Sequence, residues 1–389
     1  MTRVARRVCL AVAAALALAV SASGGGEARY GLSGSQADAT LSQVDPATLR
    51  PVGQPLRVGA FNADRAFAPD GSTLALVSQE RPVVRFVDLG EMRATGQATI
   101  APEGEVQWLR WPVGGLVALV DLPRGSMLVW LDPSTRKVTR SLRYRGELVD
   151  PKLGASGRIV AVEWPSGRVG PIRLNVIDPD GRARSTHVER IAGGWQRRNG
   201  EVVRMAEPGL AVDPDGERAW LADGDGEICE VELDSLVVVC RSLRAPAAVT
   251  KSGSPWSRRQ LKLVAPGTLA LSGWEKPTAG PRAAKAVGLW LVDTTTSERR
   301  LIDREIDSFR LAGGRIVGVR RGGVSAYGTA GAKRYGIEEP LQLGVISTTG
   351  AYLYVPRTDG RTVVAELATG RVLRRVVGGV EPFQDSDTW

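Results

Sequence analysis

Two segments of the sequence place a tryptophan two residues before a pair of arginines: GWQRRNG (194–200) and PWSRRQL (255–261). The six residues concerned are Trp195, Arg197, Arg198, Trp256, Arg258 and Arg259. A tryptophan ring can stack on a sugar or a cation, and a guanidinium binds a carboxylate or phosphate through two donors. These residues therefore predict a site for an anionic glycan or polymer. The alternative is that the arginines are solvated and the rings lie against the edge of the fold.

His187, in RSTHVER, is the only histidine of the chain. Hydrolysis by a serine or cysteine nucleophile needs a general base that titrates near neutrality, which is usually histidine. A zinc site needs several histidine or cysteine ligands, and the glycine motifs of nucleotide-binding folds do not occur here in a strand–loop–helix setting. We therefore expect no catalytic residue, no metal and no cofactor, and we expect His187 on the surface of a strand.

Carboxylates are the residues that could still carry catalysis. The alternative function is a carbohydrate-active enzyme, a glycosidase or polysaccharide lyase that uses paired carboxylates, although no S-x-D-x-G-x-T-W box supports it. The segment ADGDGE (222–227) offers Asp223, Asp225 and Glu227, but their spacing does not follow the EF-hand loop. A polar turn is the favoured interpretation of this segment, and a calcium site is the alternative.

The N-terminus has the pattern of an export signal. Arg3, Arg6 and Arg7 precede an apolar run over residues 10–20, and small residues follow at 21–23. This order predicts a secretory signal peptide, with a retained membrane anchor as the alternative. Its removal takes away three arginines and no acids, which lowers the formal charge from +9 to +6. We expect a secreted or extracytoplasmic protein with no membrane span after cleavage and no nucleic-acid partner.

Two cysteines, Cys229 and Cys240, remain after cleavage. They lie at equal distances from an expected hairpin turn at Asp234 and Ser235, so they would face each other across neighbouring strands. Facing residues of antiparallel strands have β-carbons about 4.5–5.5 Å apart, close to disulfide range. We predict a Cys229–Cys240 disulfide, which an oxidising compartment permits. Two buried thiols are the alternative.

Self-similar segments run through the chain. The first pattern is a short strand, a glycine-containing turn and an apolar strand, as in AFAPDGSTLALVS (66–78), and it occurs seven times. The second is an apolar strand, usually an acidic residue, a polar turn and another strand, as in LVWLDPSTRKVTR (128–140). We interpret its turn acids as acceptors for turn amides rather than as catalysts. These acids are Asp88, Asp132, Asp178, Asp234, Asp293 and Glu366.

Together the two patterns supply four strands with period-2 alternation and short turns, which is typical of β-propeller blades. The repeats resemble those of bacterial extracytoplasmic WD-repeat-like β-propellers, and the resemblance covers residues 37–378. It implies binding or scaffolding more often than catalysis. The Trp-Asp and Gly-His dipeptides of true WD repeats are absent.

The number of repeats predicts an all-β propeller of seven four-stranded blades. A further copy of the second pattern, LSQVDPATLRPVG (41–53), precedes the first unit. The alternative is therefore eight blades, with this N-terminal hairpin as a partial blade. The expected organisation is a signal peptide (1–23), a flexible segment (24–36), the propeller (37–378) and a C-terminal tail (379–389).

Three connections between the expected strands are predicted to be long loops: residues 190–207, 244–259 and 275–286. In a propeller, the connections that leave the fourth strand and the second strand of each blade share one face. All three long connections fall on that face, which we predict to be the binding side. We expect a monomeric, non-enzymatic binding or scaffold protein. Its partner would be an unknown protein or an anionic envelope polymer held by the six residues of the two Trp-Arg-Arg segments.

Overall fold

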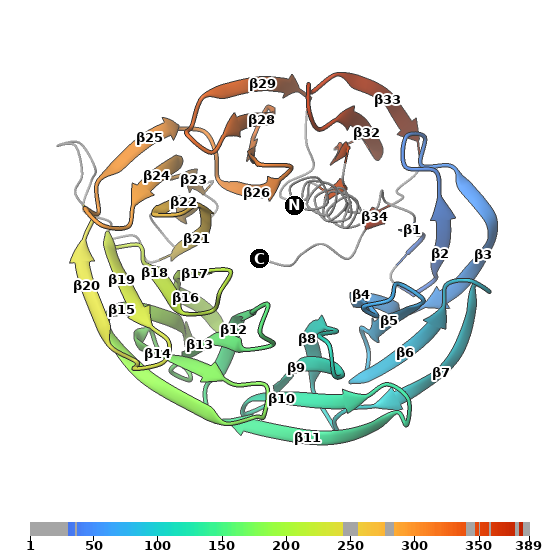
Figure 1. The fold of residues 1–389 in the computed structure, drawn as a ribbon, viewed down its shortest axis with the longest axis horizontal. Coiled ribbons are helices and arrows are strands. Elements are labelled where there is room, and N and C mark those ends of the chain that lie inside the picture. Colours follow the sequence, from blue (N-terminus) through green and yellow to red (C-terminus); the bar gives the residue numbers. More distant parts are fainter. Residues whose placement is uncertain are drawn as a thin grey trace, which may run out of the picture.

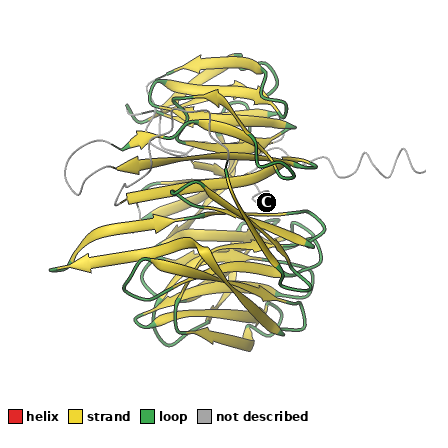
Figure 2. Ribbon diagram, turned by 90° about the vertical axis from the view of Figure 1, so that its left-hand side faces the viewer, coloured by secondary structure: helices red, strands yellow, loops and turns green. Residues whose placement is uncertain are grey.

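The computed structural model describes residues 30–35, 37–243, 256–276, 284–339, 347–349, 351–357, 359–377 and 381–383. Within these residues the regular elements are β-strands, arranged as twisted sheets around a common axis (Figures 1 and 2). The prediction of an all-β propeller is therefore confirmed. The described part contains no helix that could cross a membrane. The predicted signal peptide, residues 1–23, lies outside the described residues.

Six four-stranded sheets form separate blades, and five of these are built from four consecutive antiparallel strands. The first two comprise β4 (Phe61–Phe67), β5 (Thr73–Ser78), β6 (Val83–Asp88) and β7 (Arg93–Thr99), then β8 (Glu105–Arg110), β9 (Leu116–Leu122), β10 (Gly125–Asp132) and β11 (Lys137–Tyr144). The third comprises β17 (Gly209–Val212), β18 (Arg218–Ala222), β19 (Glu227–Glu232) and β20 (Val238–Ser242). The last two comprise β26 (Ser308–Ala312), β27 (Arg315–Arg320), β28 (Gly323–Gly328) and β29 (Lys333–Glu338), then β30 (Ser347–Thr349), β31 (Tyr352–Pro356), β32 (Arg361–Glu366) and β33 (Val372–Val377).

The sixth separate blade joins the two ends of the described chain. Its strands are β1 (Tyr30–Ser33), β2 (Ala39–Val44), β3 (Pro51–Gly59) and β34 (Glu381–Phe383), in the order β3-β2-β1-β34. Tyr30 faces Phe383 in the antiparallel pairing of β1 with β34. The ring is thus closed by a sheet that takes three strands from one end of the sequence and one from the other (Figure 1).

A ten-stranded sheet contains two further four-stranded runs, joined to each other by one strand. The first run is β12 (Glu147–Leu153), β13 (Ile159–Trp164), β14 (Gly170–Ile177) and β15 (Ala183–Arg198). The second is β21 (Trp256–Ala265), β22 (Thr268–Lys276), β24 (Leu289–Asp293) and β25 (Arg299–Asp303). The joining strand is β16 (Glu201–Glu207), and β23 (Lys285–Ala286) pairs with β22 at one end.

The prediction of seven separate blades is wrong, because the described chain forms six separate four-stranded sheets and one ten-stranded sheet. Each of the seven repeat units is present as a four-strand run. The surplus hairpin, β2–β3, is not a partial blade, because β1 and β34 complete it. These two strands have four and three residues, too few to carry a repeat pattern, and both lie outside the predicted propeller bounds of 37–378.

Burial explains the long apolar runs of the repeats. Middle strands are covered on both faces by neighbouring blades, so Leu74, Ala75, Leu76 and Val77 of β5 are all fully buried. Outermost strands face solvent on one side and alternate instead, as β11 does. The core accordingly consists of clusters between adjacent blades, such as the one that packs β5 and β6 against β9 and β10.

Most of the turn acids act as predicted. Asp132 accepts hydrogen bonds from the amide and hydroxyl of Ser134, at 2.8 and 2.7 Å, and hydroxyl donors of the turn lower its pKa to about 2. Asp88, Asp293 and Glu366 also accept hydrogen bonds from their own turns. Asp178 and Asp234 differ, because both pair with Arg158, the residue immediately before β13, each at 2.9 Å.

A hydrogen bond that recurs on the outer strands connects each of several blades to the next one. A side chain of the fourth strand donates to a backbone carbonyl in the third-to-fourth strand turn of the following blade. The four donors are Arg184 to Asp234 at 2.7 Å, Arg241 to Thr295 at 2.8 Å, Arg300 to Ala330 at 2.6 Å and Tyr335 to Leu367 at 2.7 Å. This contact gives the turn carbonyls a hydrogen-bond donor and links neighbouring blades.

Candidate functional site

The first long connection, residues 190–207, is a β-hairpin rather than a loop. β15 continues for 16 residues to Arg198, and the chain turns at Asn199 and Gly200 and returns as β16. Both turn residues have positive φ, 54° and 83°, which Asn-Gly supplies in tight hairpin turns. The expectation of a loop is therefore corrected. The tight turn lets both strands extend beyond the blade in register.

β16 also pairs in parallel with the start of β21, which makes one continuous sheet beside the ring. We call this part the raised sheet and define it as residues 194–198, 201–207, 256–259, 273–276 and 285–286. The described parts of all three predicted long connections contribute to it, so they lie side by side as expected. Residues 244–255 and 277–283 of those connections lie outside the described residues.

A row of four facing residues crosses the raised sheet. Trp195 faces Met205, Met205 faces Trp256, and Trp256 faces Lys276. Facing residues on neighbouring strands project to the same side of a sheet, and four strands span about 14 Å. The structure thus brings the two predicted tryptophans onto one surface, with the Met205 side chain between them. All four side chains are half-buried.

The two sides of the raised sheet have different neighbours. One side covers the β18–β19 turn, where a β-carbon added to Gly224 would lie 2.7 Å from the Ser257 hydroxyl. The opposite side carries the row and is turned toward β12, because the Trp195 indole N–H donates to Glu147 at 2.6 Å. Burial raises the pKa of Glu207 on this side, and the charge of Asp150 on β12 adds to the effect. We call it the β12 side.

The predicted arginines are divided between these two sides. Arg197 lies on the β12 side with its guanidinium 4.8 Å from the centre of the Trp195 ring. Arg258 lies there too, pairs with Glu207 at 3.0 Å and keeps 55% of its side chain exposed. Arg198 follows Arg197 in the strand, so it projects to the opposite side, where it is exposed.

Arg259 is not available to a ligand, which corrects its place in the predicted set. Its side chain is 7% exposed and forms an ion pair with Glu275. It also donates to the carbonyl of Gly224 at 3.2 Å and to that of Arg258 at 3.0 Å. Alternation along β21 explains the difference from Arg258, since the two neighbours must point to opposite sides of the strand.

Two cations of the raised sheet were missed by the sequence reasoning. The Lys276 ammonium lies 5.5 Å from the centre of the Trp256 ring, on the β12 side. Arg204 is exposed on β16 and faces Gln196. The available signal was the Asn-Gly dipeptide, since recognising a hairpin at 199–200 would have placed Arg204 opposite the first Trp-Arg-Arg segment.

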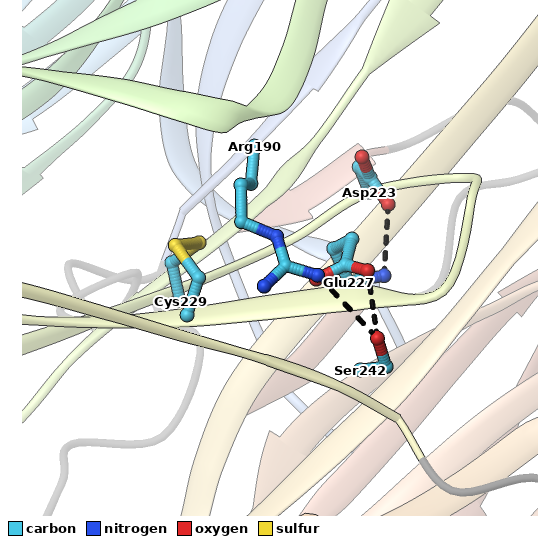
Figure 3. The surroundings of a disulfide bond; sticks show 6 residues. Arg190, Asp223, Glu227, Cys229 and Ser242 are labelled. Carbon is cyan, nitrogen blue, oxygen red and sulfur yellow. Dashed lines mark hydrogen bonds and ion pairs between the residues drawn. A yellow bond between two sulfur atoms is a disulfide. The ribbon is translucent and has the colours of Figure 1, made fainter.

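The predicted disulfide is confirmed. Cys229 faces Cys240 in the pairing of β19 with β20, and their sulfurs are 2.03 Å apart. Figure 3 shows the contacts beside it, which join this blade to β15. Glu227 accepts a hydrogen bond from the Ser242 hydroxyl at 2.8 Å and forms an ion pair with Arg190 at 2.7 Å.

Asp223 closes the β18–β19 turn. Its buried carboxylate accepts hydrogen bonds from the amides of Asp225 and Glu227, at 2.9 and 3.1 Å. Burial raises its pKa against the effect of these donors. Among the described residues, no three histidine, cysteine or carboxylate side chains are grouped closely enough to hold a metal ion. The geometry supports a polar turn, the favoured interpretation of this segment.

Three further carboxylates, those of Glu105, Asp121 and Glu147, lie where the blade of β8–β11 meets the run that begins with β12. Glu105 faces Asp121 across β8 and β9, and Glu147 begins β12. Burial raises the pKa of Asp121, and the charges of Glu147 and Glu105 add to the effect. Asp121 accepts a hydrogen bond from the Ser126 hydroxyl at 3.1 Å, and that hydroxyl accepts one from the Leu148 amide at 3.0 Å. These bonds give Asp121 a structural role.

Two other features lie away from the raised sheet. His187 is exposed on β15, as expected, with its Nε2 atom 3.0 Å from the Arg173 guanidinium. A pocket of about 460 Å³ lies between the β26–β27 and β32–β33 turns and is lined in part by Arg315, Tyr352 and Arg371. Because those turns join first to second and third to fourth strands, this pocket opens on the face opposite the raised sheet.

Solved structures define the class of this protein as a β-propeller. Dihydro-heme d1 dehydrogenase NirN in complex with DHE matches with a TM-score of 0.64 and 12% identity, over 93% of this chain and 76% of that one. BamB from Moraxella catarrhalis matches with a TM-score of 0.53 and 15% identity, over 81% and 87%. Apo AztD from Citrobacter koseri matches with a TM-score of 0.54 and 13% identity, over 91% and 95%.

At identities this low, the likeness concerns the fold alone. No family model and no curated protein matches the sequence. The resemblance to WD-repeat-like propellers is therefore supported at the level of the propeller fold.

Proposed function

We propose that this chain is an exported, non-enzymatic binding or scaffold propeller that engages its partner through the raised sheet. The observation that carries the proposal is the row Trp195, Met205, Trp256 and Lys276, which β16 assembles from two blades. Closing a propeller ring requires only the four-stranded units, so ring closure does not account for this added sheet. Additions held by a rigid scaffold are where binding residues concentrate.

Export is supported by two independent features of the chain. The basic and then apolar N-terminus has the pattern of a secretory signal. The Cys229–Cys240 disulfide is of the kind that persists in oxidising compartments. Kinship with extracytoplasmic WD-repeat-like propellers remains part of this proposal.

We further propose an anionic glycan or envelope polymer as the ligand. The raised sheet carries five cations that a polyanion could contact from its two sides: Arg197, Arg198, Arg204, Arg258 and Lys276. Glu201 and Glu207 oppose them on the hairpin, and Glu207 is already paired with Arg258. Guanidinium groups suit carboxylate, sulfate and phosphate oxygens because they offer two parallel donors.

Chromatography on immobilised heparin, a model sulfated glycan, with a neutral dextran matrix for comparison, tests this proposal. We expect Arg197→Gln/Arg198→Gln/Arg204→Gln to weaken heparin binding about tenfold, since exposed ion pairs contribute about 0.2–1 kcal/mol each. The matched control changes three exposed arginines outside the raised sheet and lowers the net charge equally: Arg81→Gln/Arg143→Gln/Arg374→Gln.

The aromatic part of the site has its own test. The double variant Trp195→Ala/Trp256→Ala removes both rings from the β12 side while leaving the five cations. We expect heparin binding to be lost in this variant. Equal retention of the three-arginine variant and its control, or unchanged binding by a folded double tryptophan variant, would overturn the proposed site.

A further inference from the structure

We propose that the Cys229–Cys240 disulfide is a redox-sensitive switch that holds the base of the raised sheet, so that reduction by a dithiol loosens the β15–β16 hairpin. This inference rests on the proposed function only in taking the raised sheet as the binding surface. The structural argument concerns three strands, β15, β19 and β20, that meet beside the disulfide (Figure 3).

The contacts of β15 reach the strand pair that the disulfide joins. Glu227 and Ser242 are facing residues of β19 and β20, two positions from Cys229 and Cys240 respectively. A spacing of two places each on the same side of its strand as the cysteine. Arg190 of β15 pairs with Glu227 at 2.7 Å and lies 3.5 Å from the Ser242 hydroxyl. The Arg190–Glu227 ion pair, which connects β15 to β19, is therefore adjacent to the disulfide.

A second contact ties the same turn to the raised sheet. Asp223 accepts a hydrogen bond from the Glu227 amide at 3.1 Å, and the carbonyl of the next residue, Gly224, accepts one from Arg259 of β21 at 3.2 Å. β21 pairs in parallel with β16 of the hairpin. Displacement of the start of β19 consequently acts on the raised sheet through the Arg190–Glu227 ion pair and through this turn.

β20 is held by backbone pairing along one edge, by a few side-chain contacts and by the disulfide. It has five residues, none of them fully buried, and it is the outermost strand of its blade. Val239 is 45% exposed, whereas Cys229 on the partner strand is fully buried. The disulfide is thus the covalent link between an exposed edge strand and the core. Without it, β20 keeps its backbone pairing and its contacts through Ser242 and Arg241.

The reduction is an ordinary thiol–disulfide exchange. One thiolate of a dithiol attacks the sulfur of Cys240, the less buried of the two residues, and forms a mixed disulfide, which releases the Cys229 thiolate. The second thiol of the reductant then displaces Cys240, so the dithiol becomes a disulfide and the protein gains two thiols after protonation. Two electrons pass from the dithiol to the protein, and no other reactant is needed.

Hydrogen exchange of the full chain, with and without dithiothreitol, tests the switch. We expect reduction to speed amide exchange about tenfold in residues 190–207 as well as in residues 227–242, while distant blades stay protected. The variant Glu227→Gln should speed exchange in residues 190–207 with the disulfide intact. Reduction of that variant should add less there than it does in the wild type.

The matched control is Glu230→Gln on the same strand. Glu230 pairs with Arg218 at 3.2 Å inside the blade, away from β15, so this change should leave residues 190–207 protected. Faster exchange confined to residues 227–242 would overturn the switch, and so would equal loss of protection in every blade. Heparin retention is measured separately: a dithiol-insensitive hairpin with intact heparin binding overturns only the switch, and a responsive hairpin without heparin binding overturns only the proposed ligand.

Discussion

Arg258 and Arg259 are neighbours in the sequence, yet we expect their replacement by methionine to have different consequences. The Arg259 guanidinium is buried, pairs with Glu275 and donates to the Gly224 carbonyl at 3.2 Å. Arg259→Met leaves that carboxylate and that carbonyl without their partner. Breaking a buried ion pair costs about 3–5 kcal/mol of unfolding free energy. Because Glu275 keeps 24% of its side chain exposed to water, we expect about 3 kcal/mol.

Arg258→Met is the matched variant, one position earlier in β21. The Arg258 guanidinium pairs with Glu207 but remains 55% exposed. Exposed ion pairs contribute about 0.2–1 kcal/mol, so this variant should lose less than 1 kcal/mol of unfolding free energy. Heparin retention should show the opposite order, with a larger loss for Arg258→Met than for Arg259→Met.

Urea unfolding followed by tryptophan fluorescence measures both effects. A double-mutant cycle of Arg259→Met with Glu275→Gln should give a coupling energy above about 1.5 kcal/mol, while Arg258→Met with Glu207→Gln should give less than about 1 kcal/mol. Equal losses for the two single arginine variants would refute the division of these arginines between a structural and an exposed role. A coupling near zero between Arg259 and Glu275 would refute it as well.

Two further predictions concern the turns. Turn donors hold the pKa of Asp132 at about 2 and lower those of Asp293 and Glu366, so these acids stabilise the fold above their unfolded pKa values. Thermal melting should therefore show stability falling as pH drops from about 4 toward 2, with a weaker pH dependence in Asp132→Asn; an unchanged pH profile would contradict this role. Gly370→Ala should lower stability by about 2–4 kcal/mol, because its φ is +71° and a β-carbon there would lie 2.2 Å from the Tyr335 ring. Gly360→Ala, with φ +75° and no atom within 4 Å of the added carbon, should lose only about 1–2 kcal/mol, and equal losses in the two variants would exclude the Tyr335 contact as the cause.

The fold was largely predictable because every unit of a propeller has the same pattern of buried strands and short turns. Each unit buries the same middle strands, and the segment 324–336 forms β28 and β29 although its turn carries no acidic residue. The closing blade was not predictable, since β34 has only three residues and pairs with a strand some 350 residues away in the sequence. Pairing over that separation depends on ring geometry, which no local pattern records.

The candidate site was predictable in composition but not in arrangement. The two Trp-Arg-Arg segments do meet, yet they do so as strands and not as loops. Strand alternation then sends Arg258 to solvent and Arg259 into the structure, although the motif makes them equivalent. Lys276 joins the aromatic row only through its register with Trp256, which depends on how far β21 and β22 extend beyond the blade.

The pairing of β34 with β1 has a consequence for the order in which the parts of the protein can fold. Every other four-strand run consists of contiguous sequence and can form as soon as its own residues are available. The sheet that contains Tyr30 stays one strand short until residues 381–383 have been synthesised. In an exported chain that crosses the membrane unfolded, the ring would therefore close only on the far side, after nearly the whole polypeptide has been released. Until then β1 presents an open edge, and such edges are where partly folded chains pair with one another.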